Sequence, residues 1–210
     1  QSKQAQQYVD FGKPEDLQFG EGDFSLSFWY KTDPHDSVTH KEGAVVSNKN
    51  WDSGGNPGFN IGDMRQGLNL NFNIEGYSDR KETDRFAQAI DGKWHHIAAT
   101  FDRDGYMTLY IDGNIYQAGH FNSNPASINI SDYHGSVDVA NFVLGADGNF
   151  KNSVLGVYLD EFAVYKQALT KEQVGELAKE ITPPESKPVL KVTFDDETAD
   201  DTSGNGLNGE

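Results

Sequence analysis

The 210-residue sequence contains no cysteine, which excludes disulfide bonds, thiolate metal sites and cysteine nucleophiles. Basic residues are scarce: 17 lysines and arginines stand against 33 aspartates and glutamates, which gives a formal net charge of -16. Because such a charge repels phosphate backbones, we expect no nucleic-acid partner. The surplus of carboxylates favours solubility, and it also suits calcium, a hard cation that prefers oxygen ligands.

Long apolar runs are missing as well. No stretch of 18 apolar residues occurs, and residues 1–12 lack the apolar segment of a signal peptide. We therefore expect a soluble segment without insertion into a membrane, and any export has to be inferred from other features. With 36% hydrophobic and 12% aromatic residues, the chain nevertheless has enough apolar surface to form one packed domain.

The apolar residues that are present recur with a period of two, which is typical of half-buried β-strands. Leu68, Leu70 and Phe72, for example, alternate with asparagines. The segments 94–101 and 106–112 flank a tight turn, DRDG, and predict an antiparallel meander. The pattern predicts further strands at 24–29, 43–47, 58–62, 114–118, 141–145 and 156–165. This spacing predicts an all-β protein built from two packed antiparallel sheets.

One of these strands contains a change of phase. In GVYLDEFAVY, Val157 and Leu159 fall on one face of an ideal strand, whereas Phe162 and Val164 fall on the other. A β-bulge at 160–161 would bring all four side chains to the same face.

A single amphipathic helix is predicted at 171–181, with Thr170 as its N-cap. The prolines of TPPESKP end it. The predicted organisation is therefore a domain at 1–181, a proline-rich linker at 182–188, and a further strand within 189–210.

Three stretches carry a family resemblance: FGEGDFSLSFWYKT, DGKWHHIAATFDRDGYMTLYIDG and LGVYLDEFAVYKQALTKEQV. Over roughly residues 8–178 they resemble the laminin-G-like, concanavalin A-like jelly rolls of secreted bacterial proteins. The resemblance implies a two-sheet antiparallel jelly-roll sandwich with one short C-terminal helix. It also implies an extracellular location, secreted or at the cell surface, and a link to other domains of a larger protein.

The two ends depart from the family pattern. The family's opening strand, with its Asp-rich turn and SGNG-like loop, is missing ahead of YVDFG, but KPVLKVTFDDETADDTSGNGLNG resembles it. Residues 189–210 therefore either complete the sheet of this domain or begin a second copy.

Catalytic patterns are absent. Related sandwiches hydrolyse β-glucans with carboxylates in an E-x-D-x-x-E strand, and neither this pattern nor HEXXH, GXSXG or a P-loop occurs. His95 and His96 are neighbours in a strand, so they point to opposite faces and cannot share one metal ion. We therefore expect no enzymatic activity.

Asp160 is the predicted metal ligand. In the related glucanases an aspartate of the equivalent strand binds a structural calcium with backbone carbonyls, and the resemblance places Asp160 there. The alternative is an outward-facing carboxylate at the bulge.

Trp51 lies in SNKNWDSGGNPG, among amides, a carboxylate and glycines that offer little apolar cover. Sugars present apolar C–H faces and hydroxyl groups, so a sugar site needs an aromatic platform with amides and carboxylates around it. Asn48, Asn50 and Asp52 supply these groups beside Trp51. The alternative is that Trp51 is a structural lid over one end of the sandwich.

The loops NKNWDSGGNPGF, DRKETDR and LGADGNF are similar to those of a subgroup that includes the levan-binding modules of bacterial fructan hydrolases. This resemblance adds Arg80, Asp84 and Asp147 to the predicted ligand contacts. The sequence therefore predicts a non-catalytic carbohydrate-binding module that holds a glycan or polysaccharide in a loop pocket around Trp51. The alternatives are an adhesion or protein-interaction domain and a structural spacer in a repeat array.

Overall fold

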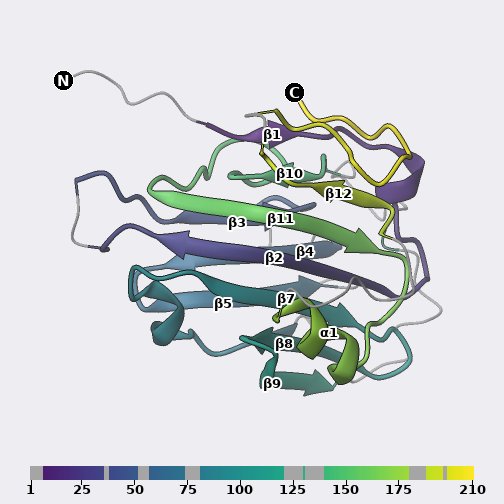
Figure 1. Cartoon of the computed structure of the whole chain (residues 1–210), viewed down its shortest axis with the longest axis horizontal. Coiled ribbons are helices and arrows are strands. Elements are labelled where there is room, and N and C mark those ends of the chain that lie inside the picture. Colours follow the sequence, from purple (N-terminus) through teal and green to yellow (C-terminus); the bar gives the residue numbers. More distant parts are fainter. Residues whose placement is uncertain are drawn as a thin grey trace.

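The computed structural model describes residues 7–35, 38–51, 57–73, 81–120, 130, 140–179, 188–195 and 198–210. Within these ranges the chain forms two six-stranded antiparallel sheets that pack as a sandwich (Figure 1). This architecture confirms the predicted fold class. No helix in the described part of the chain is long and apolar enough to cross a membrane.

The first sheet, here called sheet A, has the strand order β1-β10-β3-β4-β5-β6. Its strands are β1 (Val9–Asp10), β10 (Val143–Leu144), β3 (Gly43–Ser47), β4 (Gly58–Met64), β5 (Gly67–Asn73) and β6 (Lys81–Glu82). The second sheet, sheet B, has the order β12-β11-β2-β7-β8-β9. Its strands are β12 (Leu190–Val192), β11 (Val157–Tyr165), β2 (Phe24–Thr32), β7 (His95–Phe101), β8 (Tyr106–Ile111) and β9 (Asn114–His120).

The core lies between the sheets and is rich in phenylalanine. Phe24 of β2 stacks on Phe101 of β7 with ring centroids 4.1 Å apart, and both rings contact Phe59 of β4 across the sandwich. All three side chains are fully buried. The period-two pattern of the sequence thus identified the inward face of each strand, because residues two apart in a strand share a face.

The predicted β-bulge is present in β11. The register of β11 against β2 shifts between Asp160 and Ala163, and Glu161 has a positive φ of 49°. The extra residue returns Phe162 and Val164 to the core, where Val157 and Leu159 also pack.

The helix α1 (Lys171–Leu177) begins where the sequence predicted but is shorter than predicted. Thr170 and Gln173 form both bonds of a capping box, which fixes the start of the helix. At the other end Lys179 N donates to Glu176 O, so the helix ends in a tight turn of the 3₁₀ type. Two 3₁₀ turns, Glu15–Leu17 and Ala87–Ile90, complete the described helical elements.

The C-terminal segment lies along one side of the sandwich (Figure 1). Its strand β12 pairs with β11, with Leu190 opposite Val164 and Val192 opposite Phe162. Further on, Glu210 exchanges backbone hydrogen bonds of 2.9 and 3.1 Å with Asp10 of β1. The segment therefore forms the edge strand of sheet B and contacts β1, the edge strand of sheet A.

Candidate functional site

Trp51 lies on the outer face of sheet A. The chain leaves β3 and turns back, and Trp51 N donates to Asp147 Oδ2 at 2.9 Å. The indole is half-buried against Gly62 of β4: a Cβ added to Gly62 would lie 3.0 Å from two atoms of the ring. Glycine at this position therefore lets the indole approach the backbone of the sheet.

Asn48 and Asp147 hold this loop in place. Asn48 Oδ1 accepts a hydrogen bond from Phe59 N at 2.8 Å, which ties the end of β3 to the start of β4. Asp147 is fully buried, and its two oxygens also accept bonds from the backbone of Lys151 and from the backbone and side chain of Asn152. These bonds leave the Asp147 carboxylate little capacity for a ligand, so its geometry is that of a positioning residue.

Polar side chains form the sheet surface around Trp51. The alternation that sends Phe59, Ile61, Leu68, Leu70 and Phe72 into the core sends amides to the outer face of β4 and β5: Asn60, Asn69, Asn71 and Asn73. Asn69 Oδ1 lies near Gly62, as the indole of Trp51 does. The surface formed by Trp51, Lys49, Asn60, Asn69, Asn71 and Glu82 is called the amide face below.

Hydrogen bonds order this amide face. Lys49 Nζ donates to Asn71 Oδ1 at 3.0 Å, and Asn69 Nδ2 donates to Glu82 Oε1 at 2.7 Å. Asn60 Oδ1 and Asn71 Nδ2 are buried and have no hydrogen-bond partner among the described residues. A buried polar atom without a partner destabilises the fold by about 1–3 kcal/mol, so the native structure has to contain a reason for each one.

Of the four other predicted contacts, Asp84 lies away from this arrangement, Asn50 lies next to Trp51 in the chain, and two fall on residues that the structure does not describe. Asp84 is exposed beyond β6, and its backbone N donates to Gln117 Oε1 of β9. Asn50 is half-buried beside Trp51 in the chain. Asp52 and Arg80 lie outside the described residues.

Asp160, the predicted calcium ligand, is half-buried at the bulge of β11. Its Oδ1 accepts a hydrogen bond from Glu161 N at 2.8 Å, and its Oδ2 bonds to none of the described residues. One open carboxylate oxygen fits a calcium ion only when backbone carbonyls complete the shell, since calcium takes six to eight oxygen ligands.

The adjacent histidines have separate partners on opposite faces of β7. His95 lies between Asp112 and Asp91, at 2.9 and 3.1 Å. Burial lowers the pKa of His95, but its hydrogen bonds to these carboxylates outweigh the burial and raise the pKa overall. His96 lies 2.9 Å from Ser27 Oγ, and burial lowers its pKa to about 4 despite the opposing charge of Asp112.

The asparagines of the amide face are the candidates that the sequence prediction did not include. A signal for them exists: in LNLNFN the residues that face away from the core are all asparagine. The outward positions of a solvent-exposed sheet usually carry different kinds of polar residue, so a run of asparagines indicates a surface with a specific role. Lys49 could not be found in this way, because only the turn after β3 brings it beside Asn71.

The two-sheet sandwich defines a lectin-type fold. The chain belongs to the laminin-G family described as the Concanavalin A-like lectin/glucanases superfamily, whose model matches residues 3–175. A comparison with curated proteins found no match.

Several solved structures share the fold. A Bacteroides ovatus protein described as a candidate carbohydrate-binding protein aligns with a TM-score of 0.64 and 16% identity, over 96% of this chain and 54% of that one. The binding domain of botulinum neurotoxin DC, in complex with rat synaptotagmin II, aligns with a TM-score of 0.57 and 14% identity, over 81% of this chain and 39% of that one. The receptor-binding domain of botulinum neurotoxin D aligns with a TM-score of 0.52 and 19% identity, over 76% of this chain and 37% of that one. The chain thus spans between 37% and 54% of these longer proteins.

Proposed function

We propose that this domain is a non-catalytic carbohydrate-binding module and that the amide face around Trp51 is its binding surface. The observation that carries the proposal is the half-buried indole lying against Gly62 beside the Asn69 amide. An aromatic ring next to fixed amides is the combination that binds the apolar face and the hydroxyls of a sugar together.

The parts of this surface have different roles. Trp51 and the exposed Glu82 face the ligand, and Lys49, Asn60 and Asn71 form the nearly buried floor. The partnerless atoms Asn60 Oδ1 and Asn71 Nδ2 supply one acceptor and one donor for hydroxyl groups, which themselves both donate and accept. Both atoms are buried, so a sugar hydroxyl reaches them only if the side chains that cover them move on binding.

The predicted loop residues complete the surface. Asn48 and Asp147 position the Trp51 loop through the hydrogen bonds described above. Asn50 contacts the ligand beside Trp51, and Asp52 and Arg80 remain ligand contacts predicted from the sequence, whereas Asp84 lies away from the amide face. In this proposal the domain acts outside the cell, attached to a larger bacterial protein, and carries a structural calcium at Asp160.

The comparisons support this proposal at the level of the fold. The superfamily includes both lectins and glucanases, and the Bacteroides ovatus structure is described as a candidate carbohydrate-binding protein. We assign a binding function because the E-x-D-x-x-E pattern is absent from the sequence.

A second function, adhesion to a protein receptor, is favoured by one observation. The botulinum neurotoxin DC binding domain, which shares this fold, is bound to rat synaptotagmin II. In that case the same loops would contact a polypeptide, and no free glycan would bind.

A glycan array that includes fructans and host-type glycans tests the proposal. The parent protein should bind one class of glycan with a Kd from roughly micromolar to millimolar for a single site. Trp51→Ala should abolish binding without unfolding the domain, because stacking supplies most of the net attraction. Trp94→Ala is the matched control, since Trp94 is an exposed tryptophan before β7 of the other sheet. Binding that survives Trp51→Ala, or no glycan binding by the parent, would contradict the proposal.

A further inference from the structure

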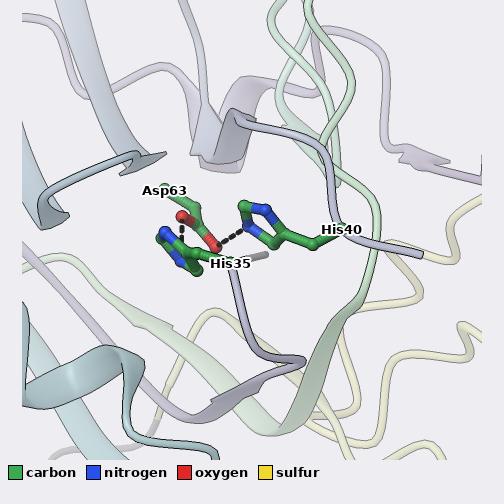
Figure 2. Close-up of side chains that lie close together, drawn as sticks. All are labelled: His35, His40 and Asp63. Carbon is green, nitrogen blue, oxygen red and sulfur yellow. Dashed lines mark hydrogen bonds and ion pairs between the residues drawn. The ribbon is translucent and has the colours of Figure 1, made fainter. Parts of the chain in front are cut away.

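A second cluster of chemically active side chains lies on the inner side of sheet A, at one end of the core. Asp63 follows Gly62 in β4 but points the other way, toward sheet B, and is fully buried. His35 and His40, from the connection between β2 and β3, both approach its carboxylate (Figure 2). His40 Nε2 is 3.1 Å from Asp63 Oδ2, and His35 Nε2 is 3.0 Å from Asp63 Oδ1.

The hydrogen bonds of this cluster are incomplete. Asp63 Oδ2 already has partners: it accepts a hydrogen bond from Tyr30 OH at 2.9 Å, and it lies 3.1 Å from His40 Nε2. Asp63 Oδ1 and both ring nitrogens of His35 are buried and have no hydrogen-bond partner among the described residues, despite the short distance between them. Three buried polar atoms without partners at one position are not explained by packing.

We propose that His35, His40 and Asp63 form a binding site for a divalent zinc ion that fastens the β2–β3 connection to sheet A. One ligand atom from each residue lies within 4.8 Å of the other two. Ligands of a tetrahedral zinc site lie about 2.0–2.2 Å from the metal and hence about 3.4 Å from one another. The 3.0 Å between His35 Nε2 and Asp63 Oδ1 is close to this value, and His40 lies within the 4.8 Å that encloses the three ligand atoms. Two imidazole nitrogens with one carboxylate favour zinc over calcium or magnesium, which prefer oxygen ligands.

The residues behind the carboxylate support this site. In metal sites the ligand groups are oriented by hydrogen bonds from further residues, and Tyr30 holds Asp63 in this manner. Oδ2 is thereby held by the protein, which leaves Oδ1 for the ion.

The arrangement requires one adjustment on binding. The rings of His35 and His40 stack with centroids 3.9 Å apart and planes inclined by 17°. A metal ion lies in the plane of each imidazole that binds it, so one ring has to turn. His35 is the ring that can turn without breaking a hydrogen bond to the described residues. Three protein ligands leave the fourth zinc position to water.

The direct test is zinc titration of chelator-treated protein by calorimetry and thermal unfolding. The parent should bind one zinc per chain, and its melting temperature should rise by about 5–10 °C at a hundredfold excess over Kd. His35→Gln and His40→Gln should each lose the site and the thermal shift. Calcium and magnesium should not occupy this site, so any thermal shift that calcium produces through Asp160 should be the same in the parent and in His35→Gln.

His95→Gln is the matched control, because His95 also contacts carboxylates, but its two nitrogens point to two different ones. This variant should bind zinc as the parent does. His35→Gln should fold, since it breaks no hydrogen bond to the described residues, and visible absorption of the cobalt-loaded parent gives a second readout of a nitrogen-and-oxygen site. A parent that binds no zinc, or a folded His35→Gln variant that binds zinc as tightly as the parent, overturns the proposal.

Discussion

The outer faces of the two sheets differ in chemistry: one is apolar and covered by a helix, and the other is polar. On sheet B the outward side chains of β7, β8 and β11 include Ala98, Tyr110 and Tyr165, and α1 covers them with Val174 (Figure 1). On sheet A the outward side chains of β4 and β5 include four asparagines, and the ring of Trp51 lies against Gly62 beside them. The first face forms a second small core, which stabilises the fold. The second is polar, and two of its buried side-chain atoms, Asn60 Oδ1 and Asn71 Nδ2, have no partner among the described residues, against one, His96 Nδ1, on the first.

The largest effect on the free energy of unfolding is expected from disrupting the apolar contact between α1 and sheet B. Val174→Asp places a charge in the fully buried contact between α1 and sheet B, and it should lower the free energy of unfolding by about 3–5 kcal/mol. Lys171→Asp, at an exposed position of the same helix, should change it by less than about 0.5 kcal/mol. Urea denaturation measures both. Equal effects of the two variants would mean that the packing of α1 on the outer face of sheet B does not stabilise the fold.

Low pH should also destabilise the fold through His96 of β7, which lies on the outer face of sheet B. Its pKa is about 4 in the folded state against an ordinary value of 6.5, so below pH 6.5 the unfolded chain binds a proton that the folded one does not. The stability linked to His96 is present above pH 6.5 and is lost as the pH falls toward 4, by about 3 kcal/mol in total. His95, whose pKa is raised, acts in the opposite sense.

The measurement is the free energy of unfolding of the parent and of His96→Gln between pH 7 and 4. The variant should show a flatter decline over this range. A decline as steep as that of the parent would assign the acid sensitivity to other groups.

Calcium removal should lower the free energy of unfolding by as much as the His96 effect or by less. A calcium ion bound only by the folded state stabilises it by about 2.7 kcal/mol at a hundredfold excess over Kd. Adding calcium after EGTA treatment should therefore raise the melting temperature of the parent but not of Asp160→Asn. If calcium leaves the parent unchanged, Asp160 is an outward-facing carboxylate at the bulge.

The smallest effect on stability is expected on the amide face. Asn60→Ala removes an acceptor that has no partner among the described residues, so the free energy of unfolding should change by less than about 1 kcal/mol. The glycan affinity should nevertheless fall about tenfold, or about 1.4 kcal/mol. Asn114→Ala, on exposed β9 of sheet B, should leave it unchanged. A large loss of stability without a change in affinity would make Asn60 a purely structural residue.

The sequence predicted the parts of the fold that depend on local pattern. Alternation identified the inward faces, the phase change in β11 located the bulge, and Thr170 marked the start of α1. The end of α1 at Leu177 was not predicted, because the apolar stripe continues on to Ile181 and only the observed turn shows where the helical hydrogen bonds stop.

The site was harder to predict because its groups meet only in three dimensions. Trp51 could be selected from its polar neighbours, but its contact with Gly62 depends on the path of the loop. Asp147 stands 96 positions from Trp51, and no local pattern reveals that hydrogen bonds occupy its carboxylate. His35 and Asp63 likewise come from separate elements, so their cluster could not be read from spacing.

The most direct test of the central claim is the indole N–H spectrum of the protein during titration with the glycan that the array identifies. The chain has three tryptophans, so three indole signals are expected, and variants assign each one. The signal of Trp51 should shift with saturation while those of Trp29 and Trp94 stay in place. A glycan that shifts Trp94 instead, or that leaves the Trp51 signal unmoved at saturation, would contradict the assignment of the amide face as the binding surface.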